Sequence, residues 1–213
     1  MAANRCDTRR AAAFVVIAGA VILASGCASL NSSVPFQYQP SLVSSGKQIP
    51  KAVGFNLLTD NRPEKDREYT KSIKDVPEKV TSKLIEDFEH SKIFQDVHYP
   101  PRENDDIVVT GNINRFKWKL YTRGIAYVPY LGLAAGIFGV PLTRAYGLAD
   151  IQLELRDKAT GRILCSTSGS SEVETLYTMY NLKTGEAGAE LAESLRDVGK
   201  KLKQDVILQL GTK

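Results

Sequence analysis

Cys27 is the residue with the clearest chemistry, because it ends an apolar run that follows a basic start with three arginines. The apolar run, Phe14–Leu23, is too short and too rich in Ala and Gly to be a good membrane-spanning helix. Small residues, Ala24–Gly26, lie directly before the cysteine. These three features together are typical of a secretory signal peptide. The sequence therefore predicts a signal peptide over residues 1–26, cleaved between Gly26 and Cys27.

The run ending in Cys27 resembles the lipobox of bacterial lipoproteins, with Ala24 in place of the more usual leucine. The resemblance implies that Cys27 becomes the first mature residue and carries acyl chains, as diacylglycerol and palmitate groups. Two or more chains hold a protein stably on a membrane. Ala28 and Ser29 follow the cysteine instead of aspartate, which in the enteric sorting pattern implies the outer membrane. We expect the domain to face the periplasm. The alternative is an ordinary signal peptide with a chance cysteine.

One further cysteine remains in the mature chain, because Cys6 leaves with the signal peptide. Cys165 lies in a predicted strand, on the same face as Ile163. We expect it to be a small buried hydrophobic residue. The alternative, a reactive nucleophile, would need a nearby base.

Signatures of catalysis and phosphate binding are missing from the sequence. Gly46-Lys47 lacks the upstream glycine of a phosphate-binding loop. Motifs of the types G-x-S-x-G, H-E-x-x-H and C-x-x-C do not occur. The two histidines, His90 and His98, have no further zinc ligands close in sequence, and we expect them at the surface or at a boundary.

Two acidic pairs have the composition of an acid/base couple. Asp105-Asp106 lies at a strand entry, and Asp150 and Glu154 lie on the polar face of a strand, positions that favour solvation. We therefore predict no catalytic residue, no metal site and no cofactor.

The segment 124–143, between Arg123 and Arg144, contains twenty residues without a charge. Its length matches a membrane span, but its Gly and Pro residues argue against one continuous helix. Its flanks carry the aromatic and basic residues found at membrane interfaces. These are Trp118, Lys119, Tyr121, Arg123, Arg144 and Tyr146.

Three interpretations of segment 124–143 stay open: a loop packed on the domain's own core, a protein or oligomer interface, and a membrane-inserted hairpin. So long an apolar loop on a soluble domain suggests a contact surface. The candidate interaction residues are Tyr127, Tyr130, Leu131, Leu133, Ile137 and Phe138.

Residues 27–50 are rich in Ser, Pro and Gln and predict a flexible tether, in which Phe36 and Tyr38 could dock on the domain or on a partner. Residues 51–213 are expected to form a single domain, with the apolar insertion 124–143. Loss of three Arg and one Asp with the signal peptide lowers the formal charge from +4 to +2. Such a near-balanced charge gives no footprint for nucleic acid.

In the first half of the domain, the sequence predicts a strand over 51–58, a charged solvated loop over 64–74 and a helix that begins at Asp75. Asp75 and Glu78 have the spacing of a capping box. Alternation and helical spacing assign two sets of residues to the core. The sets are Val53, Phe55 and Leu57 on the strand, and Val80, Leu84 and Phe88 on the helix, followed by Ile93 and Phe94.

The second half predicts a strand over 106–120 with a bulge near Asn114-Arg115, and a hairpin of two strands joined at 157–161. A helix over 186–210 follows. The inward residues are Ala149, Ile151, Leu153 and Leu155 on the strand, and Leu191, Leu195, Val198, Leu202 and Val206 on the helix.

This element order predicts an α+β fold: a two-layer sandwich of a curved, mostly antiparallel sheet with two helices on one face. After a lipidated cysteine, the order resembles the small outer-membrane lipoprotein domains of the LptE, TolB N-terminal and CsgG-like group over about residues 50–210, without shared motif residues. The strands around the apolar Gly-rich segment also resemble the layout of TraT-type surface-exclusion lipoproteins.

By analogy, these resemblances imply a non-catalytic accessory, scaffold or assembly subunit of an outer-membrane or trans-envelope complex. Its expected partners are the membrane, through acylated Cys27, and an envelope protein or further copies of the chain, but not nucleic acid. The alternative is a self-oligomerising or membrane-inserting lipoprotein that uses segment 124–143. An enzyme or small-ligand binder is the third class.

Overall fold

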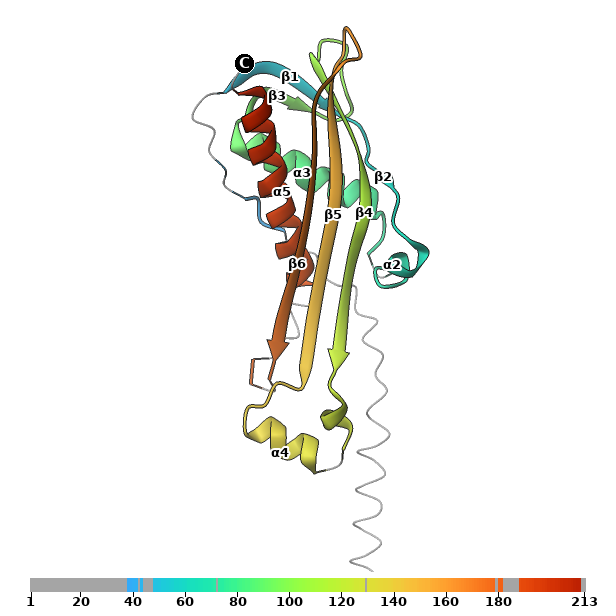
Figure 1. Cartoon of the computed structure of the whole chain (residues 1–213), viewed down its shortest axis with the longest axis vertical. Coiled ribbons are helices and arrows are strands. Elements are labelled where there is room, and N and C mark those ends of the chain that lie inside the picture. Colours follow the sequence, from blue (N-terminus) through green and yellow to red (C-terminus); the bar gives the residue numbers. More distant parts are fainter. Residues whose placement is uncertain are drawn as a thin grey trace, which may run out of the picture. The chain divides into compact units, whose positions relative to one another are not determined.

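The computed structural model describes residues 38–41, 43, 48–71, 73–128, 130–178, 180–181 and 188–211 (Figure 1). The predicted signal peptide and the cleavage site at Gly26 and Cys27 lie outside these residues. The elements, in chain order, are β1 (Ile49–Phe55), β2 (Thr59–Asp60), α2 (Glu64–Glu68), α3 (Val76–Ser91), β3 (Phe94–His98), β4 (Ile107–Thr122), the 3-10 helix η2 (Gly124–Tyr127), α4 (Leu131–Ile137), β5 (Thr143–Asp157), β6 (Ile163–Tyr177) and α5 (Ala189–Leu210).

The strands form one mixed sheet in the order β3-β1-β4-β5-β6, with β2 paired to β4. The long strands β4, β5 and β6 are antiparallel, because each is joined to the next by a hairpin connection. The short β1 is parallel to β3 and β4, since α3 carries the chain across between β1 and β3. The predicted α+β class and its long antiparallel strands are confirmed.

Helices α3 and α5 contact each other and cover one face of the sheet (Figure 1). Their apolar stripes are buried as predicted, from Val80 to Phe88 on α3 and from Leu191 to Val206 on α5. The inward residues of β5, from Ala149 to Leu155, are fully buried between the helices and the sheet. Periodic burial of this kind is the main stabilising contribution to the domain.

The predicted bulge is present, because the pairing of β4 with β5 shifts between Ile113 and Arg115. The shift allows Ile113 and Phe116, three residues apart, to be buried on the same face. Beyond Phe116, six further residues of β4 extend the hairpin by about 20 Å to Thr122.

Part of the predicted tether packs on the domain. Tyr38 and Ser41 are buried, and both bond to Asp87 on α3. Tyr38 thus docks on the domain, one of the two outcomes expected for it. The rest of the tether before residue 38 lies outside the described residues.

Three local predictions are wrong. Leu57 is exposed, because β1 ends at Phe55 and the next inward residue is Leu58. The segment expected to be a solvated loop contains α2. The capping box at Asp75 does not form: this residue adopts a left-handed conformation and its side chain makes no capping bond to the helix.

Candidate interaction surface

The apolar segment forms the distal tip of the β4–β5 hairpin, defined here as residues 124–143. Its base is the last strand pair, Thr122 opposite Thr143. Figure 1 shows α4 at the end of the long strands that lies farthest from β1 and β3. Two short helices, η2 and α4, make up the tip.

All six candidate interaction residues are exposed and lie together on this tip. The exposed fractions are 74% for Tyr127, 86% for Tyr130, 57% for Leu131, 61% for Leu133, 55% for Ile137 and 85% for Phe138. The segment therefore does not pack on the domain's core. The described residues contain no helix that is both long enough and apolar enough to span a membrane.

Small residues form the contact inside the tip. Gly132 and Gly136 are the buried residues of α4. A Cβ at Gly132 would lie 2.7 Å from the carbonyl oxygen of Ala126, so α4 and η2 are packed backbone to backbone. The large side chains of α4 consequently point away from η2.

A basic groove lies directly beside the tip, on the face of the sheet opposite α3 and α5. It is open, has a volume of about 560 Å³, and is lined by Lys117, Tyr121, Thr122, Arg123, Arg144 and Tyr146. Burial and then Glu172 raise the pKa of Tyr146. The neighbouring Lys119 lies over the ring of Tyr121 at 4.2 Å, and hydrogen bonds to Tyr121 and Tyr69 raise its pKa.

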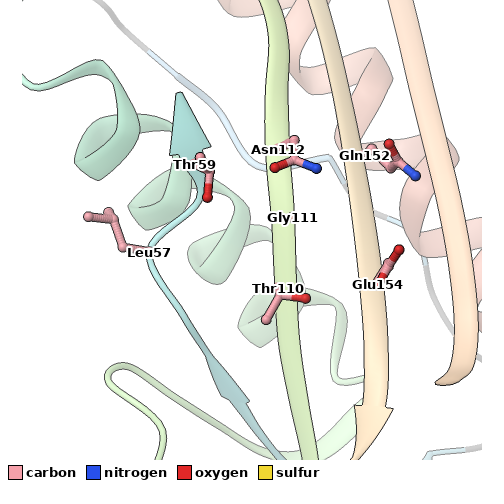
Figure 2. A pocket seen from close by; sticks show the side chains of 7 residues that line it. All are labelled: Leu57, Thr59, Thr110, Gly111, Asn112, Gln152 and Glu154. Atoms are coloured by element: carbon pink, nitrogen blue, oxygen red, sulfur yellow. The ribbon is translucent and has the colours of Figure 1, made fainter. Parts of the chain in front are cut away.

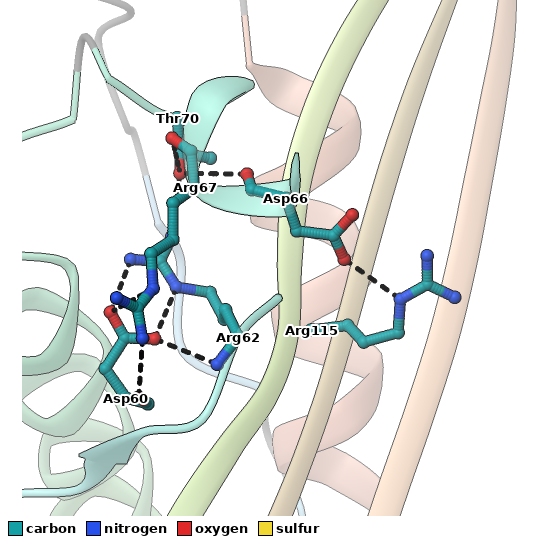
Figure 3. Close-up of polar contacts among 6 residues, drawn as sticks. All are labelled: Asp60, Arg62, Asp66, Arg67, Thr70 and Arg115. Carbon is teal, nitrogen blue, oxygen red and sulfur yellow. Dashed lines mark hydrogen bonds and ion pairs between the residues drawn. The ribbon is translucent and has the colours of Figure 1, made fainter. Parts of the chain in front are cut away.

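Helix α2 holds the outer face of β4 just before the groove, a role that the sequence did not indicate (Figure 3). The carboxylate of Asp66 accepts a hydrogen bond from Arg115 at 3.0 Å and lies 3.7 Å from Lys117. At the start of α2, Arg62 donates twice to Asp60, at 2.9 Å each, and to Thr70. The bond from Arg62 lowers the pKa of Asp60, although burial opposes it.

Glu190 ties the other face of the hairpin to α5. It is 2% exposed and accepts hydrogen bonds from the indole of Trp118 at 3.0 Å and from the hydroxyl of Tyr177 at 2.6 Å. In the sequence, Glu190 is only an acid in the first turn of a helix. Its partners lie on two distant strands, so no local pattern could identify this contact.

A smaller groove lies on the outer face of the sheet (Figure 2). Its volume is about 190 Å³, and its lining is Leu57, Thr59, Thr110, Gly111, Asn112, Gln152 and Glu154. Glu154 pairs with Arg156 at 2.7 Å, and Asp150 accepts a bond from Asn114 at 3.2 Å. The two acids lie on the polar face, as expected, and each has its own structural partner there.

The second acidic pair differs from its prediction. Asp106 is exposed, but Asp105 is 4% exposed, contacts His98 at 2.6 Å and accepts a bond from the amide of Arg102. Burial raises the pKa of Asp105, but these two bonds outweigh it and the pKa is lowered. His90 is exposed and His98 lies at a boundary, as expected. The described residues contain no cluster of metal-ligating side chains.

Cys165 is buried, as predicted, with 2% exposed. Ile163 does not share its surroundings: it is 47% exposed, because the pairing of β5 with β6 shifts at this end of the hairpin. Burial raises the pKa of the Cys165 thiol to about 11, and Asp205 adds to the effect.

We expect Cys165 to resist thiol reagents in the native protein at pH 8 and to react fully after denaturation, because the thiolate is the nucleophile. The measurement is mass spectrometry of the peptide that contains Cys165. Cys165→Ala should cost on the order of 1 kcal/mol, since few atoms are removed. Rapid native labelling would instead indicate an accessible, activated thiol.

Comparison with known proteins gives a fold. The sequence matches no protein-family model and no curated protein. A solved structure of a Xanthomonas campestris protein of family DUF330 is similar, with a TM-score of 0.51 and 10% identity over 83% of this chain and 94% of that chain. This likeness shows a shared fold.

Two further solved structures are more distant. The PelC dodecamer of Paraburkholderia phytofirmans has a TM-score of 0.38 and 12% identity, over 73% of this chain and 95% of that chain. A minor lipoprotein of Acinetobacter baumannii has a TM-score of 0.38 and 9% identity, over 74% of this chain and 91% of that chain. At such scores neither carries an argument about function.

Proposed function

We propose that this chain is a lipid-anchored, non-catalytic lipoprotein of the outer membrane, facing the periplasm. It acts there as an accessory, scaffold or assembly subunit of an outer-membrane or trans-envelope complex. The observation that carries the proposal is the combination of a lipobox-like run ending in Cys27 with an exposed apolar tip. The first supplies an anchor, and the second supplies a surface for a further contact.

The surroundings of the reactive groups support a non-catalytic role. Asp105 is engaged by His98 and a backbone amide, and Glu190 by Trp118 and Tyr177. Cys165 is a buried thiol with a raised pKa. All three groups are at most 4% exposed, whereas a catalytic acid, base or nucleophile needs access to its substrate.

Acylation of Cys27 is tested by Cys27→Ser. We expect the variant to remain an unprocessed precursor and to incorporate no labelled fatty acid, because the thiol that carries the lipid is gone. Cys165→Ser is the matched control and should be processed and labelled like the natural chain. Normal processing of Cys27→Ser, or a mature chain that begins elsewhere, would contradict lipid anchoring.

The alternative function, a self-oligomerising lipoprotein that uses the distal tip, is favoured by the same exposed apolar side chains. The mass of the protein particle in detergent distinguishes self-assembly from the accessory role. Several copies per particle, lost on Ile137→Asp, would support self-assembly. A monomer that is captured with other proteins in crosslinked envelopes would support the accessory role.

A further inference from the structure

Acidic residues are absent between Asp106 and Asp150, although five basic residues lie in that stretch of sequence. Two of the five, Lys119 and Arg123, have no carboxylate partner among the described residues. Arg144 pairs with Glu174 at 2.5 Å. Lys119 and Arg123 therefore leave the part of the hairpin next to the tip with a net positive charge. Such a surface is complementary to anionic headgroups.

Helix α4 has the reverse of the usual burial pattern. Its glycines face the rest of the tip, while Leu131, Leu133 and Ile137 face outwards. Folding in water would place the large apolar side chains inside. Apart from two tyrosine hydroxyls, the sequence from Gly124 to Leu142 contains no polar side chain. Most protein–protein interfaces combine an apolar centre with polar groups at their rim, and within the tip only these two hydroxyls could supply such groups.

The backbone of the tip satisfies many of its own hydrogen bonds. The amide of Arg123 donates to Leu142, closing the base at 2.8 Å, and the amide of Leu142 donates to Tyr177. Within the tip, the amides of Ala126, Val128, Gly132, Ala134, Phe138, Gly139 and Val140 all donate to carbonyl oxygens of the tip or its base. Internal bonding of this kind is required of a backbone that leaves water for a lipid phase.

We propose that the distal tip inserts into the interfacial region of a lipid bilayer that contains anionic phospholipids. Tyr130, Leu133 and Phe138 enter the boundary between headgroups and acyl chains, and the basic groove faces the phosphates. An apolar body of helical width fits the 5–10 Å depth reached by interfacial helices. Aromatic and basic flanks at one level are what such a boundary favours. The tip assignment rests on the proposed function only in that the acyl anchor brings the chain to a membrane.

The test uses the full acylated chain in vesicles of phosphatidylethanolamine and phosphatidylglycerol with brominated acyl chains, which quench nearby tryptophan. Phe138→Trp adds a reporter at the tip, and the natural chain supplies the background from its single tryptophan, Trp118. Leu208→Trp, at a position 69% exposed on α5, is the matched control. We expect strong additional quenching from Phe138→Trp and none from Leu208→Trp. Equal quenching of the two reporters would overturn the inference.

Two substitutions test which interactions hold the tip in the bilayer. The effect of each is expressed as the ratio of docked to undocked tip. Leu133→Asp should lower the ratio at least a hundredfold, because it introduces a charge into the apolar phase. Arg123→Glu should lower it roughly thirtyfold in anionic vesicles, about fivefold for each unit of charge, and little in phosphatidylcholine. Lys201→Glu on α5 is the control. If neither Leu133→Asp nor Arg123→Glu lowers the ratio, the inference is contradicted.

The melting temperature of Leu133→Asp tests the core-packed interpretation. Leu133 is 61% exposed, so the melting temperature should be nearly unchanged in detergent. A large fall would mean that the side chain is buried in the domain and would overturn bilayer insertion.

A protein bound to the tip, or a missing lipid anchor, would give results that differ from those expected for bilayer insertion. A second copy or a protein partner on the tip would shield position 138 and prevent quenching, against the inference. Acylated chains without quenching at position 138 would overturn the tip assignment alone and leave the proposed function standing. Quenching without acylation would support the tip assignment and contradict lipid anchoring.

Discussion

Replacing Lys203 by methionine is expected to destabilise the domain by about 3–5 kcal/mol, because it leaves the carboxylate of Asp87 buried without its cation. Both side chains are fully buried, and the ammonium lies 3.1 Å from the carboxylate. Lys203 also donates to the carbonyl oxygen of Ser41 at 2.5 Å and to Ser91 at 2.8 Å. Burial lowers the pKa of Lys203, whereas Asp87 opposes that shift.

Asp87→Asn should cost a similar amount, for the converse reason that the ammonium would keep only neutral partners. Urea unfolding followed by circular dichroism measures both changes. Lys201→Met, on the exposed face of α5, is the control and should lie within about 0.5 kcal/mol of the natural chain. In the double variant, Asp87→Asn with Lys203→Met, the costs should be much less than additive. Full additivity would show that the two groups do not interact.

The same pair fixes the segment before β1. The amide of Ser41 donates to Asp87 at 2.6 Å, and the hydroxyl of Tyr38 donates to the same carboxylate. Burial, and then the hydrogen bond to Asp87, raise the pKa of Tyr38. Asp87→Asn should therefore speed hydrogen exchange at the Ser41 amide more than at β5. Unchanged exchange at Ser41 would contradict a docking role for Asp87.

The apolar layer of this fold could be predicted because its signal is periodic. The stripe from Leu191 to Val206 and the alternation from Ala149 to Leu155 each follow one helix or strand, so local spacing alone identifies the inward face. Even the bulge before Phe116 could be predicted, since the apolar phase reverses there. The docking of β1 between β3 and β4 could not, because parallel pairing depends on segments that are distant in sequence.

Buried polar groups gave no comparable signal. Lys203 and Asp87 are 116 residues apart, and charged residues on helices are solvated in most proteins. The direction in which an apolar segment faces is equally hidden. Segment 124–143 has the composition of core, interface and membrane alike, and only its place beyond Thr122 shows that it is exposed.

The sequence also does not show which glycines are needed for close packing. Among these, Gly147 gives the largest expected effect on stability. A Cβ at Gly147 would lie 2.3 Å from the backbone carbonyl carbon of Glu190 and 2.4 Å from the amide nitrogen of Leu191. Backbone atoms cannot move aside as a flexible side chain can, so α5 would have to shift from β5. We expect Gly147→Ala to destabilise the domain by about 3 kcal/mol.

Gly124→Ala is the control for Gly147→Ala, because nothing lies within 4 Å of the added methyl group. It should leave stability unchanged or slightly raised. The fluorescence of Trp118, opposite Gly147 in the strand pair and bonded to Glu190, reports the local shift. If α5 moves, this bond is lost and the emission of Gly147→Ala shifts to the red, while Gly124→Ala keeps the natural spectrum. Natural stability and emission in Gly147→Ala would refute close backbone packing of β5 on α5.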